Sequence, residues 1–250
     1  MASRLSRDLE LKFRMFSGRL NQARSRFWGH PDIAELFPDL IFRMHCEARS
    51  TVSLLRTAID RLKALSGSDP LASRLLPYLA GLAHEETGHD DWLLQAQEAV
   101  GVSRDEAWHR HPPATTAAMV GSQYYWILHH HPVALLGFIK AVEREPPTRA
   151  DIDALRRRTG LPKGAFTYQL GHVGVETKHN ADLDRVLDEL PFSEAHRSLM
   201  GVSLLNTIHF LALGLEEMVT LHESSRVSPS PTARRKRTLR TIREVGAKVG

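Results

Sequence analysis

The sequence contains a single cysteine, Cys46, among its 250 residues. One cysteine excludes an intramolecular disulfide framework and any zinc or iron–sulfur site that needs several thiolates, and it fits a reducing compartment. No apolar run is long enough for us to expect a membrane span, and the opening residues MASRLSRDLELKF lack the apolar segment of a secretion signal. These absences predict a soluble, cytoplasmic protein without a membrane partner.

Segments that alternate apolar and polar residues with a period of two are also missing, so no β-sheet is expected. No repeat or low-complexity linker occurs before residue 226. Hydrophobic residues make up 42% and charged residues 25% of the chain, a composition typical of globular proteins. We therefore expect one folded domain over residues 1–225.

The net charge of +4 comes from residues 226–250, which contain eight Lys or Arg residues and one acidic residue. The rest of the chain holds 25 basic and 28 acidic side chains. A body with this slightly acidic balance does not resemble a nucleic-acid-binding surface, so no nucleic-acid partner is expected. Residues 226–250 are predicted to form a basic, flexible tail.

Apolar residues recur at helical spacing through most of the sequence. Asp69 before Pro70, and Thr148 before DIDALRRRTG, are typical helix starts, and Gly160 is a typical helix end. The expected helices span residues 4–28, 38–65, 70–100, 148–160, 163–189, 193–225 and a stretch 115–146 hinged near His131-Pro132, with a short segment at 103–109. Together they predict an all-α bundle of about seven helices.

Fourteen histidines is a high number for this length, and imidazole is a common metal ligand. Three potential ligands, His172, Glu176 and His179, lie within the helix predicted for residues 163–189. Their spacing of four and three residues places them on one face of a continuous helix. We therefore predict half of a metal site on this helix, completed by ligands from a facing helix.

The helix predicted for residues 70–100 supplies Glu86 and His89, a Glu-x-x-His pair of the kind that helix bundles use to hold metal pairs. Glu143 lies on an otherwise apolar stripe and is the best candidate for a further carboxylate. Glu85 and Glu145 are geometrically acceptable alternatives to Glu86 and Glu143. Three imidazoles and three carboxylates suit two iron or manganese ions with open positions. The predicted metal-binding and catalytic set is Glu86, His89, Glu143, His172, Glu176 and His179.

Three blocks of the sequence together resemble the haem-oxygenase-like diiron oxidases and oxygenases, a family also described as iron-containing redox enzymes. The blocks are Glu-x-x-His-Asp at 86–90, HPVALLGFIKAVE ending at Glu143, and His-x-x-x-Glu-x-x-His at 172–179. Their order and separation match over roughly residues 35–220, except that the family more often has Asp at the position of Glu176.

This resemblance implies a haem-oxygenase-like bundle that binds two iron ions instead of haem and uses O₂ as co-substrate. Members of the family oxidise amino acids, amines or fatty acids by N-oxygenation, oxidative carbon–carbon cleavage or desaturation, in biosynthetic pathways. The implied partner is a small molecule, and we take Arg43, Arg49 and Lys140 as candidates for contacting its head group. A homodimer is compatible with the sequence.

Other functions on the same fold are alternatives. Cys46 is compatible with a thiaminase-like enzyme, although a lone cysteine on a helix is more often a small buried residue. A haem-degrading enzyme would need a pocket without internal carboxylates, which the three predicted acids oppose. A non-catalytic metal-binding bundle is the third alternative. His45 with Glu47, and the tract His129 to His131, are not expected to be ligands.

Overall fold

The computed structural model of this chain describes residues 4–143, 147–173 and 175–227, except for the side chains of 175–177 and 227. Within these ranges the chain forms α-helices, one short 3₁₀ helix and no strand, which confirms the predicted all-α fold. The elements are α1 (Leu5–Phe16), α2 (Gly18–Gly29), α3 (Ile33–Leu65), α4 (Pro70–Glu85), α5 (His89–Ala99), α6 (Arg104–His109), α7 (Ala114–His129), α8 (Ala134–Val142), α9 (Arg149–Thr159), η1 (Lys163–Phe166), α10 (Thr167–His172), α11 (Val175–Glu189) and α12 (Glu194–Val227).

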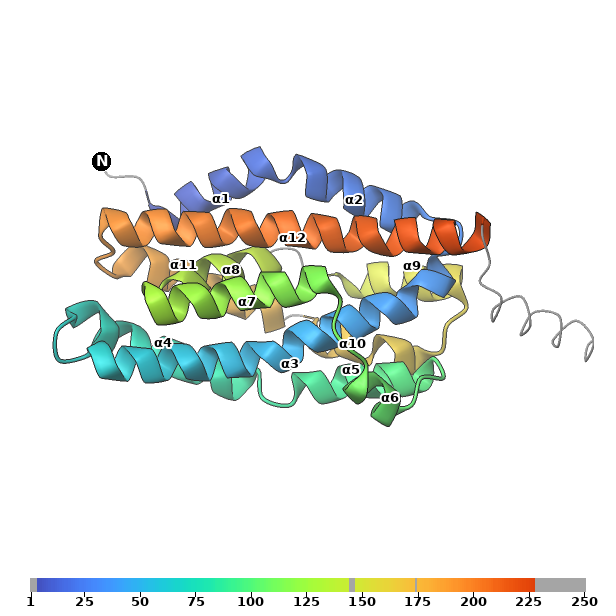
Figure 1. The fold of residues 1–250 in the computed structure, drawn as a ribbon, viewed down its shortest axis with the longest axis horizontal. Coiled ribbons are helices and arrows are strands. Elements are labelled where there is room, and N and C mark those ends of the chain that lie inside the picture. The colour runs from blue at the N-terminus through green and yellow to red at the C-terminus, as the bar shows by residue number, and fades with distance from the viewer. Residues whose placement is uncertain (1–3, 144–146, 174, 228–250) are drawn as a thin grey trace, which may run out of the picture.

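Two long helices, α3 and α12, run along the bundle in opposite directions (Figure 1). α12 packs against α1, α2, α7 and α8, whereas α3 packs against α4, α5 and α7. Their apolar faces meet in one main core, which includes the fully buried side chains of Leu54, Leu136 and Leu204. The short helices α8, α10 and α11 belong to the same bundle. Most of the predicted ligands lie at or near the ends of these three helices.

The helix predicted for residues 70–100 is divided at the candidate ligand pair. α4 ends at Glu85 and α5 begins at His89. Gly88 between them has a φ of 94°, a left-handed conformation that residues with a side chain rarely adopt. Glu86 and His89 therefore flank a turn, and the prediction that one continuous helix carries both residues is wrong.

The helix predicted for residues 163–189 is divided in a similar way. The 3₁₀ helix η1 leads into α10, which ends at His172, and α11 begins at Val175. The break begins at Val173, and Gly171 shortly before it has low helix propensity. His172 and His179 therefore come from different helices, and the single stripe predicted for them is wrong.

Several other helix ends follow their predicted signals. The Asp69 carboxylate caps α4 by accepting a hydrogen bond from a backbone N–H of its first turn. α9 begins with a capping box formed by Thr148 and Asp151, and it ends at Gly160 with a φ of 67°. The N-terminal segment differs from the prediction because it bends at Ser17, between α1 and α2.

α8 approaches α12 more closely than a side chain would allow. A Cβ atom at Gly137 would lie 2.1 Å from the backbone oxygen of Met200, so only glycine permits this contact. The hinge predicted at His131-Pro132 lies between α7 and α8. The close contact with α12 fixes the end of α8, and Glu143 is the residue that follows it.

α12 is apolar and long enough to cross a membrane by length and composition alone, contrary to the prediction that no such run exists. In the structure 44% of its apolar window is buried, and the helix packs against α1, α2, α3, α7 and α8. A core helix of a bundle can have the same composition. The basic tail predicted for residues 226–250 lies almost entirely beyond the described chain, which ends at Val227.

Candidate metal centre

Two groups of potential metal ligands meet inside the bundle and share one residue. Glu86 lies with His89 and His172 in the first group, and with Glu143 and His179 in the second. Within each group, one ligand atom from each residue lies within 4.8 Å of the others. A carboxylate common to two ligand groups is the arrangement expected of a carboxylate-bridged metal pair.

Glu86 and His89 remain in contact although no continuous helix joins them. The Nδ1 atom of His89 lies 3.0 Å from Oε2 of Glu86, and each side chain is only 10% exposed. The left-handed backbone at Gly88 turns the chain so that both side chains point to the same place. The predicted pairing of these two residues therefore survives the break between α4 and α5.

His172 reaches the first group from the last turn of α10. Its Nδ1 atom lies 2.9 Å from the backbone oxygen of Tyr168. A carbonyl oxygen only accepts hydrogen bonds, so Nδ1 carries the proton and Nε2 retains the lone pair that a metal requires. Burial lowers the pKa of His172, which favours the neutral ring.

Trp92 packs against both histidines of the first group. Its ring stacks on His89 with 4.5 Å between centroids, and it meets His172 edge-on at 5.6 Å. A Cβ atom at Gly171 would lie 2.7 Å from the indole, so the glycine makes room for it. Sequence reasoning missed Trp92, although its position three residues after His89 was an available signal.

Glu143 and His179 form the second group with Glu86. The Nδ1 atom of His179 lies 3.7 Å from Oε2 of Glu143 and 3.6 Å from Oε1 of Glu86. The side-chain amide of Asn180 donates a hydrogen bond of 2.6 Å to the backbone oxygen of Glu143, which ties α11 to the end of α8. Two neighbouring residues of α11 therefore hold this group together.

The electrostatics of the second group reflect buried acids around one imidazole. The Glu143 carboxylate raises the pKa of His179 to about 9. Burial acts to lower this pKa, and the carboxylates of Glu85 and Glu86 act to raise it further. Burial raises the pKa of Glu143 above its usual value. A divalent cation would replace the His179 proton and balance the carboxylates, because metal ligands bind in their deprotonated forms.

Glu85, the alternative to Glu86, lies on the outer side of His179. Its Oε2 atom is 2.8 Å from Nε2 of His179, and its Oε1 atom is 2.6 Å from Nζ of Lys178. The Glu85 side chain is 40% exposed, compared with 10% for Glu86. The structure therefore places Glu86, and not Glu85, in both ligand groups.

Two of the sequence predictions fall outside the described residues. Glu176 belongs to α11, but its side chain is among those that the structure leaves undescribed. Glu145, the alternative to Glu143, lies in the undescribed segment 144–146. The structure thus brings together five of the six predicted ligands and leaves the sixth as a prediction.

Two cations expected near a substrate head group are engaged elsewhere. Nη2 of Arg43 lies 2.8 Å from Glu217, and Nζ of Lys140 lies 2.6 Å from Asp184. Both cations are buried, and separating a buried charge from its partner is costly. Arg43 and Lys140 are therefore engaged in ion pairs within the bundle and are not available to a ligand.

The histidines that were not expected to be ligands lie outside both groups. His131 makes a contact of 2.9 Å with the capping carboxylate Asp69. His45 is fully buried, and neither ring nitrogen has a hydrogen-bond partner in the described part of the chain. Burial lowers the pKa of His45, so its ring is neutral.

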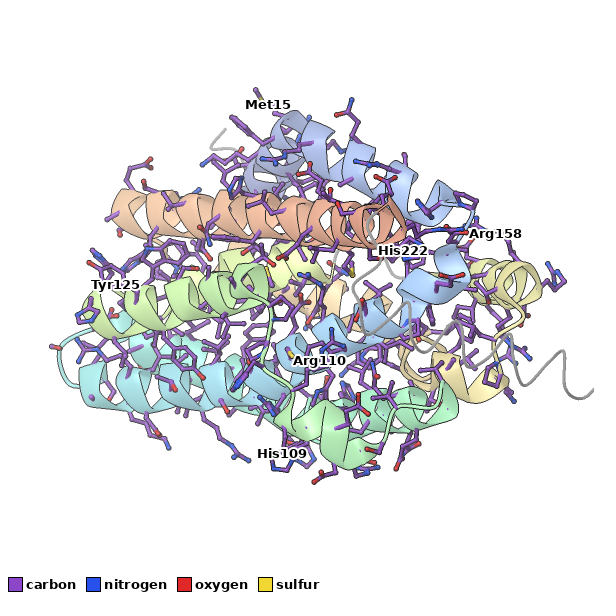
Figure 2. All side chains as sticks on the ribbon, turned by 45° about the vertical axis from the view of Figure 1, so that its right-hand side comes forward. Met15, His109, Arg110, Tyr125, Arg158 and His222 are labelled. Carbon is purple, nitrogen blue, oxygen red and sulfur yellow. The ribbon has the colours of Figure 1, made fainter. Side chains whose placement is uncertain are left out.

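A third group of potential ligands, His30, Asp32 and His222, lies where α12 ends beside the start of α3 (Figure 2). The Asp32 carboxylate already accepts hydrogen bonds from Arg226 and, at 3.2 Å, from His222. Nδ1 of His30 accepts a hydrogen bond of 3.1 Å from the backbone N–H of Asp32. These contacts account for the group as an ion-pair cluster that joins two helix ends.

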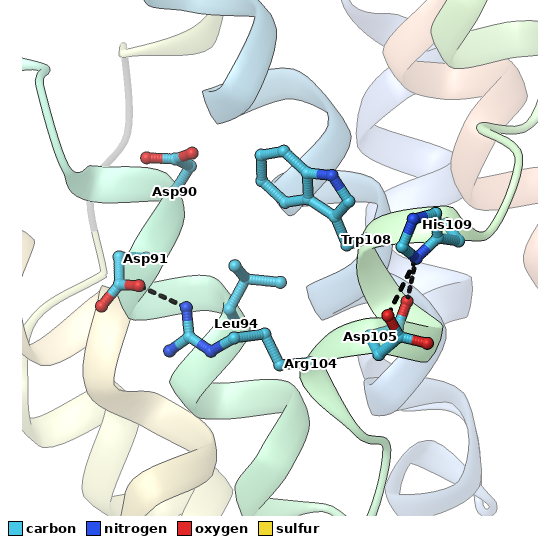
Figure 3. Close-up of a pocket in the computed structure, with 7 residues that line it drawn as sticks. All are labelled: Asp90, Asp91, Leu94, Arg104, Asp105, Trp108 and His109. Carbon is cyan, nitrogen blue, oxygen red and sulfur yellow. Dashed lines mark hydrogen bonds and ion pairs between the residues drawn. The ribbon is translucent and has the colours of Figure 1, made fainter.

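A hollow of about 550 Å³ lies between α5 and α6 (Figure 3). Its first lining residue in the sequence, Asp90, directly follows His89. Asp91 pairs with Arg104 in this hollow, and Asp105 pairs with His109. Asp90 has no ion-pair partner among the residues that line it. The complete lining is Asp90, Asp91, Leu94, Arg104, Asp105, Trp108 and His109. The guanidinium of Arg49, also considered for a head group, lies 5.0 Å from the Trp108 ring centre.

The donor atoms of the centre fit a pair of iron ions. Imidazole nitrogens and carboxylate oxygens without a thiolate are typical ligands of non-haem iron and manganese. Oε2 of Glu143 and Nδ1 of His179 are buried and, among the described residues, lack a hydrogen-bond partner. Buried polar atoms without partners are rare, and an ion between these two would satisfy both.

Comparison with known proteins gives one family and two related folds. A family model described as iron-containing redox enzyme matches residues 51–202. A domain of unknown function from Shewanella denitrificans, with a heme oxygenase-like fold, is 18% identical with a TM-score of 0.56, and the match covers 84% of this chain and 95% of that one. A TenA homolog from Pseudomonas syringae pv. tomato is 10% identical with a TM-score of 0.61, covering 84% and 93%. No protein with a curated description matches the chain.

Proposed function

The chain belongs to the iron-containing redox enzyme family, and we propose that it is an O₂-dependent, non-haem diiron oxidase or oxygenase on a haem-oxygenase-like fold. The observation that carries this proposal is the pair of ligand groups that share Glu86. A single metal ion would need only one of these groups. Two groups with a common carboxylate match the way helix bundles hold two ions side by side.

Each ligand group is proposed to hold one iron. His89 and His172 would bind one ion, Glu143 and His179 would bind the other, and Glu86 would bridge them. Glu176 is proposed as the sixth ligand. The two irons, when bound in the reduced state, would supply the electrons that O₂ activation requires and that no side chain of this centre provides.

The protein's own residues prepare this centre before any metal binds. The backbone oxygen of Tyr168 fixes the tautomer of His172, and Trp92 covers the rings of His89 and His172. Asn180 anchors the backbone at Glu143. These contacts hold the ligands in place and keep water from most of their surface, which limits the reorganisation that metal binding would otherwise require.

We propose a small amine or amino acid as the substrate, approaching from the hollow between α5 and α6. Asp90 supplies a carboxylate without an ion-pair partner there and directly follows the proposed ligand His89. Trp108 lies across the hollow from Asp90 and offers an apolar surface (Figure 3). An ammonium group is attracted by this carboxylate, whereas the carboxylate of a fatty acid would be repelled by it.

Two alternatives on the same fold have less support from the site. A cysteine nucleophile would need an ionised thiol, but burial raises the pKa of Cys46 to about 11. Haem would need a broad apolar cavity, whereas the interior holds two carboxylates and three imidazoles in close contact. A non-catalytic iron-binding bundle differs from the proposed enzyme in having no turnover. The following experiment measures turnover.

The test is O₂ consumption by the full-length protein loaded anaerobically with Fe(II). We expect consumption to be accelerated by lysine, a probe with an ammonium-bearing side chain, and not by lauric acid, a fatty-acid probe. The Asp90→Asn variant should keep its iron and lose most of the acceleration by lysine. Acceleration by lauric acid alone would contradict the proposed substrate class, and no O₂ consumption with any small amine or acid would contradict the proposed enzyme.

A further inference from the structure

Glu85 and Glu86 are consecutive residues that contact opposite edges of the same imidazole. Oε1 of Glu86 lies 3.6 Å from Nδ1 of His179, and Oε2 of Glu85 lies 2.8 Å from Nε2. The ring is 2% exposed and therefore has little freedom to turn. Each nitrogen of His179 thus faces a different carboxylate, and both carboxylates come from the end of α4.

The Glu85 carboxylate is itself held at both oxygens by α11. Oε2 contacts His179, and Oε1 lies 2.6 Å from Nζ of the preceding residue, Lys178. A carboxylate with one strong partner on each oxygen has a defined orientation, unlike an isolated surface ion pair. Lys178 therefore sets the direction from which Glu85 contacts the imidazole.

The first turns of α11 depend on polar contacts for their position. The helix packs against α1, α8 and α10, and it begins directly after the break that follows His172. Three consecutive residues near its start, Lys178, His179 and Asn180, reach across to Glu85 and Glu143. The contacts of Glu85 connect α11 to the end of α4, where Glu86 begins the turn that leads to His89.

We propose that Glu85 is a positioning residue that makes His179 present Nδ1, and not Nε2, to the metal pair. This inference rests on the proposed diiron function and goes beyond it, because it names the ligating atom and the residue that selects it. A carboxylate that accepts the N–H of a metal-bound imidazole fixes the tautomer and orientation of the ring. His172 shows the opposite choice, because Tyr168 occupies its Nδ1 and leaves Nε2 for the metal.

The ligating nitrogen is read by NMR on full-length protein with ¹⁵N-labelled histidine and bound Zn²⁺, a diamagnetic probe for iron. We expect the signal that disappears in His179→Ala to show a proton on Nε2 and the metal on Nδ1. A signal with the proton on Nδ1 would overturn the assignment. This readout does not depend on turnover. An ion pair with a purely structural role would not determine which nitrogen of His179 carries the proton.

The role of Glu85 is tested by anaerobic Fe(II) binding to the full-length chain. In Glu85→Ala we expect the affinity for one of the two irons to fall by about 10- to 100-fold, with the other unchanged. Glu85→Gln should recover part of the loss, because its amide oxygen still accepts the Nε2 proton. Glu189→Ala, which removes an exposed carboxylate elsewhere on α11, is the matched control and should bind iron as the wild type does.

The outcomes separate this inference from the proposed function. Two irons in the wild type, bound equally well by Glu85→Ala, would overturn the role of Glu85 alone. Loss of both irons in Glu85→Ala with an unchanged melting temperature would make Glu85 a ligand and also overturn it. A wild-type chain that binds no iron would overturn the proposed function itself. Glu85→Gln, which keeps the size of the side chain, provides the same readout if Glu85→Ala fails to fold.

Discussion

At the scale of single residues, the state of Cys46 distinguishes a cysteine nucleophile from iron-dependent oxidation. Its side chain is buried in α3, and burial raises the pKa of its thiol to about 11, so the thiol is protonated near neutral pH. We expect Cys46→Ala to consume O₂ at the wild-type rate after iron loading. Loss of activity in this variant, with iron content and melting temperature retained, would instead favour a cysteine nucleophile.

The sequence predicted carboxylates and imidazoles as the ligand types, and the structure brings five of the six predicted side chains together. The sequence did not distinguish Glu85 from Glu86. Adjacent helical residues point about 100° apart, and only the turn at Gly88 determines which of them faces inward. Trp92 escaped notice because a position three residues after a ligand, its only signal, is equally typical of an ordinary core aromatic.

At the scale of secondary structure, the contact between α8 and α12 positions the second ligand group. A methyl group at Gly137 would overlap the backbone oxygen of Met200, so Gly137→Ala must push the two helices apart. We expect the free energy of unfolding to fall by about 1–3 kcal/mol, the usual cost of overpacking a core. Urea denaturation of the full-length protein measures this change.

Gly121→Ala is the matched control for that substitution. Gly121 lies inside α7, and a Cβ atom added there meets nothing within 4 Å. Alanine favours a helix by up to about 1 kcal/mol over glycine, so this variant should be as stable as the wild type or more so. Equal destabilisation by the two substitutions would show that the contact between α8 and α12 is not the cause.

Asp69 gives the start of α4 a pH-dependent stability. Burial acts to raise the pKa of its carboxyl, but hydrogen bonds from the Leu71 N–H and from His131 outweigh burial and hold the pKa below its usual value. A carboxyl whose pKa is lower in the folded state stabilises it above the unfolded-state value of about 3.9. That contribution is lost as the pH falls through the folded-state pKa.

Asp69→Ala is therefore expected to lower the free energy of unfolding by about 1 kcal/mol at neutral pH. The difference from the wild type should shrink as the pH falls below about 4, and it should vanish below the folded-state pKa, where Asp69 is protonated in both states. Denaturation curves at a series of pH values measure this difference. A difference that stays constant down to the lowest pH would show that the carboxylate is not the source.

The sequence predicted the existence of the main helices better than their continuity. Apolar periodicity extends through both 70–100 and 163–189, and it does not respond to a local break. Gly88 lies in the first break and Gly171 lies shortly before the second, and isolated glycines are also compatible with a helix interior. Each break lies beside a predicted ligand, so the interruptions contribute to the geometry of the centre.

At the scale of the whole molecule, the bundle brings five potential ligands to one place from distant parts of the chain. Glu86 and His89 flank the turn after α4, Glu143 follows α8, and the two remaining histidines come from α10 and α11. α12 lies on α8 and has an apolar character that composition alone cannot separate from that of a membrane helix. The sequence does not display the packing of α12, which in this structure buries 44% of that apolar window.

The central claim is that two irons share Glu86, and iron stoichiometry tests it most directly. Full-length wild-type protein, loaded anaerobically with Fe(II) and freed of loosely bound metal, should retain two irons per chain. His89→Ala and Glu143→Ala should each lose one iron, whereas Glu86→Ala should lose both because its carboxylate belongs to both ligand groups. One iron per wild-type chain, or two irons retained by a folded Glu86→Ala variant, would contradict the account.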